Sequence, residues 1–240
     1  MQPTDSPTIE DAYSKLAQTY QSQEESPYCT DLEFPAMTDL LPNIEAKRVL
    51  DAGCGHGRYA EWLAEKGGDV VAVDNNTEML EQARQRLTDD VDIRRGDITE
   101  PLEFADDGSF DGVVSGLPLH YVEDWHEAFT EFARLLRPGG FLVFSAQHPV
   151  DEYIAFDAEN YFETEQEQMT WSAGSDEVDV PFYRRPFSEV INPLIETGFQ
   201  IDELVEPRPT EGFKEKKPES YEKRLKYPTF LCIRASKSTA

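Results

Sequence analysis

The sequence predicts an open α/β fold, a doubly wound and mostly parallel sheet with helices on both faces. Three observations support this fold class. Residues 47–57 combine a short apolar strand, a glycine-rich turn and the start of a helix. Residues 69–74 (DVVAVD) form a nearly continuous apolar run, which is typical of a buried parallel strand. Strand-like and helix-like segments then alternate as far as residue 235, which favours βαβ units.

The glycine-rich turn has the pattern D-x-G-x-G-x-G, from Asp51 through Gly53 and Gly55 to Gly57. Glycine allows a sharp turn to lie against a ligand because it has no Cβ. A dinucleotide fingerprint would require its third glycine at position 58, which is Arg58. A carboxylate before the turn repels a pyrophosphate but attracts cationic groups. The turn therefore favours a cationic cofactor over a nicotinamide dinucleotide.

The other elements follow from hydrophobic periodicity and turn signals. Two arms at 161–171 and 178–185, around a glycine-containing turn, predict a hairpin. One short helix is expected between the last two strands. In chain order we expect helices over 8–20 and 32–41, a strand ending at 51, a helix over 58–66, a strand at 69–74, a helix from 76 to 87, strands at 91–95 and 109–115, a helix over 125–136, a strand at 141–145, the hairpin, a helix over 187–197, and strands at 199–205 and 229–235.

Asp74 ends the second strand, 21 residues beyond Gly53. A carboxylate at this place suits the paired hydroxyls of a ribose. Nicotinamide enzymes share the feature, so it indicates an adenosine without selecting the cofactor. The alternative role for Asp74 is to cap the helix that starts at 76–77.

Together these stretches resemble the class I methyltransferases that use S-adenosylmethionine (SAM). The resemblance covers about residues 45–145 and is strongest to the broad group that includes the ubiquinone and menaquinone methyltransferases. It implies a Rossmann-like sheet of seven strands whose last strand is antiparallel, with a helical lid over residues 1–42. The motifs that carry the resemblance are D-A-G-C-G-H-G (51–57), D-V-V-A-V-D (69–74), G-D-I (96–98) and L-R-P-G-G (136–140).

The resemblance also implies the cofactor contacts. Met79 can equally fill the core, Asp97 can cap its own loop, and the stripe that carries Tyr13 and Tyr20 can face the core. The implied cofactor residues are Asp51, Ala52, Gly53, Cys54 and Gly55 for the methionine moiety, Asp74 and Asn75 for the ribose, Met79, Gly96, Asp97 and Ile98 for the adenine, Ser115 and Gly116 at the site of methyl transfer, and Tyr20 at the end of the lid.

The loop after the fourth strand reads G-L-P-L-H-Y (116–121) and holds two candidate catalytic residues, His120 and Tyr121. An unperturbed histidine, with a pKa of about 6.5, suits a general base for a substrate hydroxyl. The alternative is a histidine packed beneath the site. Enzymes that methylate amino groups of nucleic acids usually carry Asn/Asp-Pro-Pro-aromatic here. The S-G-L-P at 115–118 departs from that motif and argues against such a substrate.

Residues 147–186 are too long for a bare loop in a compact domain. We expect a cap that shapes the acceptor pocket, with His148, Tyr183 and Arg184 as candidate substrate-binding residues, joined by Tyr13 from the lid. A structural flap or an oligomer contact is the alternative.

The chain carries 22 basic and 48 acidic residues, a net charge of -26. This excess makes nucleic acid and anionic membranes poor partners. It resembles proteins of salt-loving organisms, and an ordinary acidic cytosolic protein is the alternative. The three cysteines lack metal spacing, so we expect no metal. The N-terminus is polar and no apolar run is long enough to span a membrane, which predicts a cytoplasmic protein. We expect one domain over residues 1–240, as a monomer or a homodimer.

The predicted function is methyl transfer from SAM to an oxygen, nitrogen or carbon nucleophile of a small molecule. An RNA methyltransferase and a catalytically silent SAM-binding scaffold are the alternatives. A nicotinamide dehydrogenase is disfavoured by Asp51 and Arg58.

Overall fold

The computed structural model describes Ala12, residues 26–173 and residues 176–239. Within them, the strand order of the main sheet is β3-β2-β1-β4-β5-β9-β8. Neighbouring strands are parallel, apart from β9, which is antiparallel to β5 and to β8. This confirms the predicted seven-stranded sheet. Its strands are β1 (Arg48–Ala52), β2 (Asp69–Asp74), β3 (Asp92–Arg95), β4 (Phe110–Gly116), β5 (Leu136–Gln147), β8 (Phe199–Val205) and β9 (Phe230–Lys237).

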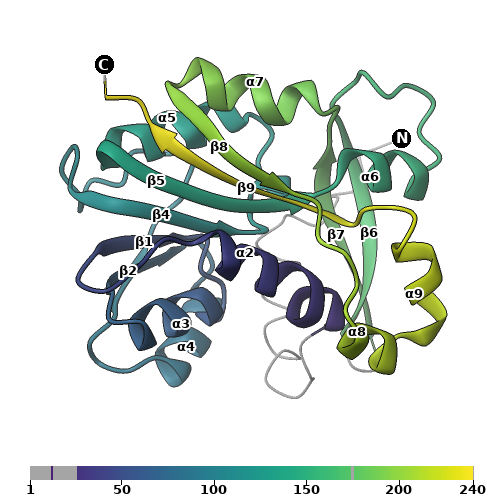
Figure 1. Ribbon diagram of the computed structural model, residues 1–240, viewed down its shortest axis with the longest axis horizontal. Coiled ribbons are helices and arrows are strands. Elements are labelled where there is room, and N and C mark those ends of the chain that lie inside the picture. Colours follow the sequence, from purple (N-terminus) through teal and green to yellow (C-terminus); the bar gives the residue numbers. More distant parts are fainter. Residues whose placement is uncertain (1–11, 13–25, 174–175, 240) are drawn as a thin grey trace, which may run out of the picture.

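Helices cover both faces of the sheet. Helices α5 and α7 lie on one face, and α2, α3 and α4 lie on the other (Figure 1). The apolar stripe of α5 shows why: Ala128, Phe129, Phe132 and Leu135 recur at helical spacing and are all fully buried. The helical elements are the π-helical η1 (Cys29–Glu33), α2 (Phe34–Leu40), α3 (Arg58–Glu65), α4 (Thr77–Arg86), the 3₁₀-helical η2 (Leu119–Tyr121), α5 (Trp125–Leu135), α6 (Pro149–Ala155), α7 (Ser188–Glu196), α8 (Glu211–Lys216) and α9 (Pro218–Arg224).

The strand order reverses between β1 and β4. From β1 the chain builds the sheet outward through β2 and β3, and from β4 it builds in the other direction. Open α/β sheets bind ligands in the crevice at such a switch point, beyond the carboxyl ends of the strands. This topology brings together the segments that follow β1, β2, β3 and β4.

A separate two-stranded antiparallel sheet follows β5. It consists of β6 (Glu165–Ala173) and β7 (Asp176–Arg184), which lie beside α6, α8 and α9 in Figure 1. The preceding helix α6 was not predicted. Its signals are present in the sequence, because His148 accepts a hydrogen bond from Val150 N, Pro149 opens the helix and two acids occupy its first turn.

Two other expectations differ from the structure. Two helices, α8 and α9, replace the single short helix expected between the last two strands, and Pro218 begins the second of them. Strand β5 begins at Leu136 and not at residue 141, because Leu136 already pairs with Phe110 and a bulge absorbs the Pro-Gly-Gly segment before pairing resumes at Phe141. Apart from Ala12, the helix expected over 8–20 lies outside the described residues, and so do Tyr13 and Tyr20. Among the described helices, none is long and apolar enough to cross a bilayer.

Candidate active site

The glycine-rich turn after β1 has a left-handed backbone at each glycine. The φ angles of Gly53, Gly55 and Gly57 are +75°, +53° and +86°. The amides of Gly53 and Cys54 donate to Val73 O at 2.9 and 2.8 Å, which ties the turn to β2. A Cβ added at Gly55 would meet no atom of the described residues within 4 Å, so within that part of the chain the turn borders open space here.

Asp51 is fully buried beneath that turn. Its Oδ2 accepts from Ala60 N at 2.9 Å, whereas its Oδ1 is buried without a hydrogen-bond partner among the described residues. Burial, with the nearby charge of Asp74, raises the pKa of Asp51 to about 7. A buried carboxylate oxygen with no partner is suited to pair with a cationic group.

Asp74 joins two loops at the end of β2. Its Oδ2 accepts from Gly55 N at 2.8 Å and its Oδ1 accepts from Asn76 N at 2.9 Å. Burial raises the pKa of Asp74, which these hydrogen bonds oppose. The N-cap of α4 is Asn76, whose side chain accepts from Met79 N. Asp74 therefore does not cap α4 itself but binds the backbone nitrogen of the capping residue.

The segment after β3 lies next to Asp74. Asn75 Nδ2 donates to Asp97 Oδ2 at 3.2 Å. Asp97 Oδ1 accepts from the backbone N and the hydroxyl of Thr99, at 2.9 and 2.7 Å, so Asp97 also organises its own loop. Ile98 and Met79 are buried, at 7% and 2% exposure. Of the two acids predicted for the ribose and the adenine, Asp74 ends β2 and Asp97 follows the neighbouring strand β3 by two residues.

Ser115, Gly116 and Cys54 are further residues predicted at the cofactor site. Ser115 is fully buried and donates to Ala52 O at 3.0 Å. A Cβ added at Gly116 would lie 2.1 Å from the ring of Tyr59, so this glycine allows α3 to lie against the end of β4. Burial raises the pKa of the Cys54 thiol well above its usual value, which makes a nucleophilic thiolate unfavourable there.

Residues 50–144 match the sequence profile of a methyltransferase domain. Over the whole fold, the chain is similar to the solved S-adenosylmethionine-dependent methyltransferase of Mesorhizobium loti. The two share 29% sequence identity with a TM-score of 0.70, over 85% of this chain and 97% of that one. The chain carries a class I SAM-dependent methyltransferase domain.

Curated relatives of this methyltransferase domain include O-methyltransferases. The ubiquinone biosynthesis O-methyltransferase of Alkalilimnicola ehrlichii is 35% identical over 116 residues, 48% of this chain and 47% of the relative. The malonyl-acyl-carrier protein O-methyltransferase of Enterobacter lignolyticus is 32% identical over 145 residues, 60% of this chain and 55% of the relative. The chain thus spans about half the length of these two relatives.

His120, the candidate general base, lies in η2. The side chain is 5% exposed, and within the part of the chain that the structure describes its Nδ1 is buried without a hydrogen-bond partner. Burial, helped by the charge of Arg185, lowers the pKa of His120 to about 3, so the imidazole is neutral at physiological pH. The ring of Tyr121 lies 3.9 Å away, centroid to centroid. A neutral imidazole accepts a hydrogen bond readily but retains an extra proton poorly.

His120 borders a small hollow between the β6–β7 hairpin and the loop after β4. We call the place where their side chains meet the hairpin hollow, and it is lined by His120, Tyr121, Gln147, Met169, Val180 and Phe182. Sequence reasoning missed the four residues that follow Tyr121 in this list. The available signal was the alternation of Val178, Val180 and Phe182 along β7, which places apolar side chains on one face of the hairpin.

The three substrate-binding candidates of the insertion do not line the hairpin hollow. His148 contacts Glu206 Oε1 at 2.9 Å and caps α6. Tyr183 donates to Glu123 Oε2 at 3.3 Å, on the opposite face of β7 from Phe182. Arg184 is 1% exposed and pairs with Glu165. Roles for these three in acceptor binding remain predictions.

A buried acid near the site was also missed. Glu33, at the end of η1, is 1% exposed, and its Oε1 accepts from Tyr59 OH at 2.6 Å and from the hydroxyl of Ser145. Burial raises the pKa of Glu33. In the sequence, Glu33 reads as an ordinary polar position of an amphipathic helix, and no local signal separates it from its exposed neighbours.

Proposed function

We propose that the chain transfers the methyl group of SAM to a small-molecule acceptor held in the hairpin hollow. The observation that carries this proposal is the contact between the glycine-rich turn and the loop after β4, because the same loop supplies part of the wall of the hollow. A Cβ added at Gly53 would lie 2.5 Å from Pro118 Cβ, so the turn and the loop after β4 are in direct contact. Two residues after Pro118, His120 enters the wall of the hollow.

The described residues fit the cofactor. Among the described residues, Oδ1 of Asp51 has no hydrogen-bond partner and is available to the ammonium group of the methionine moiety, and the open side of Gly55 leaves space for it. Asp74 would accept from the ribose hydroxyls, and Asp97 with Ile98 would hold the adenine. Bound SAM supplies an electrophilic methyl group on a sulfonium.

The hairpin hollow offers uncharged chemistry to the acceptor. Met169, Val180 and Phe182 form an apolar wall, and the imidazole of His120 and the amide of Gln147 supply neutral hydrogen-bonding groups. An acceptor with an apolar body and a hydroxyl group matches this lining, because a buried polar group requires a partner. Residues 147–186 would then serve as the cap of the acceptor pocket.

In this scheme the chain contributes mainly alignment. Orienting two reactants can lower a barrier by up to about 7–11 kcal/mol. His120 Nδ1 would accept the hydrogen bond of the acceptor hydroxyl and so orient one oxygen lone pair toward the methyl group. Because its pKa is low, His120 would pass the proton on to water and not keep it.

The test compares two tryptophan variants of the hairpin. Met169→Trp fills the hollow, whereas Thr170→Trp places the same bulk on the opposite face of β6. Calorimetric titration with the product S-adenosylhomocysteine (SAH) measures the cofactor side. Transfer of labelled methyl groups from SAM to the small-molecule fraction of a cell extract measures the acceptor side.

We expect Met169→Trp to retain SAH affinity and lose methyl transfer, and Thr170→Trp to retain both. Full transfer by Met169→Trp would refute the hollow as the acceptor site. Label found in the RNA or protein fraction of the extract would refute a small-molecule acceptor.

A further inference from the structure

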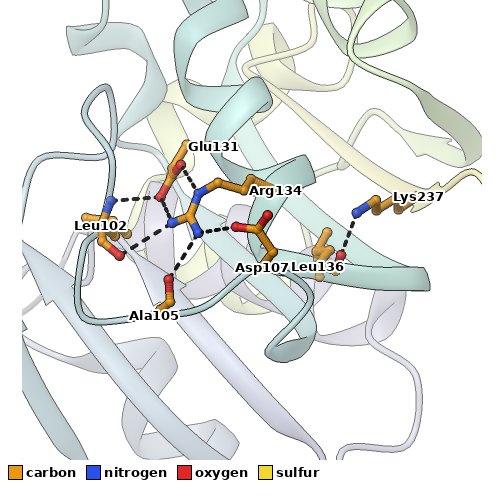
Figure 2. Close-up of polar contacts among 7 residues, drawn as sticks. All are labelled: Leu102, Ala105, Asp107, Glu131, Arg134, Leu136 and Lys237. Carbon is orange, nitrogen blue, oxygen red and sulfur yellow. Dashed lines mark hydrogen bonds and ion pairs between the residues drawn. The ribbon is translucent and has the colours of Figure 1, made fainter.

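One arginine at the end of α5 holds the long loop that follows β3. The loop, residues 97–109, contains no helix or strand. Arg134 Nη1 donates to Ala105 O at 3.0 Å and to Asp107 Oδ1 at 2.8 Å, and Nη2 contacts Leu102 O at 3.4 Å (Figure 2). The backbone oxygen of Arg134 also accepts from Gly108 N at 2.9 Å.

Glu131 completes this arrangement one helical turn earlier. Its two carboxylate oxygens accept from Arg134 Nη2 and Nε at 2.6 and 2.8 Å, a bidentate pair. Glu131 Oε1, the oxygen that accepts from Arg134 Nη2, also accepts from Leu102 N at 2.7 Å (Figure 2). Glu131 is 7% exposed, so the pair is shielded from solvent on one side. We call Glu131 and Arg134 the Arg134 clamp.

The clamp is connected to the start of the loop through Leu102. A Cβ added at Gly96 would lie 2.7 Å from Leu102 Cδ2, so the held part of the loop folds back onto the residue before Asp97. Leu102 and Ile98 are 3% and 7% exposed and belong to the same core cluster. Moving Leu102 would therefore move the backbone at 96–98.

We propose that Arg134 and Glu131 are positioning residues for the adenine of SAM. They fix Leu102, and Leu102 fixes the backbone that presents Asp97 and Ile98. The inference rests on the proposed placement of the adenine at those two residues. Because the loop has no strand pairing of its own, loosening the clamp changes the geometry of the adenine edge while the sheet stays intact.

The experiment compares SAH with S-inosylhomocysteine, in which a carbonyl replaces the exocyclic amino group of the adenine. Arg134→Lys keeps the charge but loses the planar fork that reaches five oxygen atoms. Arg137→Lys is the matched control, because Arg137 pairs with Asp111 of β4, outside the loop, at 2.5 Å. Both ligands are titrated calorimetrically into each full-length variant, well below its unfolding temperature.

We expect Arg134→Lys to bind SAH about tenfold more weakly while its affinity for S-inosylhomocysteine falls less than about threefold, since only the amino group depends on a well-placed Asp97. Arg137→Lys should leave both affinities unchanged. Glu131→Gln, which keeps an oxygen for Leu102 N, should change the ratio of affinities in the same direction but less, and it carries the test if Arg134→Lys does not fold.

An unchanged ratio of the two affinities in Arg134→Lys, with only a lower unfolding temperature, would overturn the inference and leave the clamp a structural feature. Equal binding of the two ligands by the wild type would also overturn it. Failure of the wild type to bind SAH at all would refute the proposed function itself, which keeps the two failures distinct.

Discussion

The backbone nitrogen of Gly55 donates a hydrogen bond of 2.8 Å to Oδ2 of Asp74, which joins the glycine-rich turn to the end of the neighbouring strand. The second oxygen of Asp74 accepts from Asn76 N. Each oxygen therefore retains acceptor capacity for a ligand, because a carboxylate has about four lone-pair sites. The residue proposed to bind the ribose also holds the turn proposed to bind the methionine moiety.

Asp74→Ala is expected to weaken SAH binding by about 10–100-fold, since hydrogen bonds to a charged group contribute about 1.5–3 kcal/mol. Calorimetric titration measures this loss. Asp69→Ala is the control, because Asp69 begins the same strand, is exposed and pairs with Arg48 at 3.8 Å. Equal effects of the two substitutions would contradict a specific role for Asp74.

Two glycines of the turn should respond differently to alanine. The methyl group of Gly55→Ala would contact no described atom, so the substitution should cost only the strain of φ +53°, about 1–2 kcal/mol. The same methyl group would enter the space proposed for the cofactor and should weaken SAH binding at least about tenfold. Gly53→Ala adds a clash with Pro118 at 2.5 Å to a φ of +75° and should destabilise the fold more. Thermal unfolding and titration separate these effects. Wild-type SAH affinity in Gly55→Ala would exclude the proposed placement.

SAH affinity should rise with pH around neutrality. The pKa of Asp51 is raised to about 7 by burial, and the ammonium group of SAH pairs with the ionised carboxylate. Below pH 7 the ligand must displace a proton, so we expect binding about tenfold weaker at pH 6 than at pH 8. Titrations at both values, in Asp51→Asn as well, test this. The variant should bind weakly with no such slope, and a wild type without the slope would disprove the pairing.

His120 should make the fold sensitive to acid. Its pKa is lowered to about 3 in the folded state from about 6.5 when unfolded, so between these values the unfolded chain binds more protons. Stability from His120 is therefore complete above pH 6.5 and decreases by about 1.4 kcal/mol per unit as the pH falls. Urea denaturation measures the free energy of unfolding at pH 7 and at pH 5. The decrease between the two pH values should be about 2 kcal/mol smaller in His120→Gln than in the wild type. His126→Gln, at an exposed position of α5, is the control.

Glu33 should contribute strongly to stability. Glu33→Ala leaves the hydroxyls of Tyr59 and Ser145 without their acceptor and should lower the free energy of unfolding by about 2–4 kcal/mol. Glu33→Gln retains an acceptor oxygen and should cost less than about 1 kcal/mol. Urea denaturation measures both, with Asp39→Ala of the exposed face of α2 as the control. Equal losses for alanine and glutamine at position 33 would argue against the hydrogen-bond explanation.

Much of the fold was predictable because buried strands are bounded by strong signals. The bounds of β2 and β8 are those expected, since an acid or a glycine ends or precedes each apolar run. Two element boundaries were not predictable. Helix α6 begins at a histidine N-cap, which is an unusual capping residue, and the start of β5 depends on a bulge that only the pairing with β4 reveals.

The candidate site divides in the same way. Asp51 and Asp74 lie at the carboxyl ends of β1 and β2, and Asp97 comes just after β3, so topology alone brings them to one edge of the sheet. Glu33 and the hollow-lining Met169 and Phe182 acquire their positions from contacts between segments distant in sequence. Tyr183 was predicted to bind the substrate because its side chain is polar. The alternation of side chains along β7 instead directs the neighbouring Phe182 toward the hollow.

The insertion of β9 between β5 and β8 has a consequence for synthesis on the ribosome. Strand β8 is translated before residues 206–229 and before β9, its one neighbour in the sheet among the described strands. During the same interval the edge of β5 that later pairs with β9 is unpaired. Nascent chains with unpaired edges are prone to wrong associations. The packing of α7 against α5 gives β8 an anchor in the meantime. The sheet can therefore close only after residues 230–237 have been translated and have slid between two strands already made.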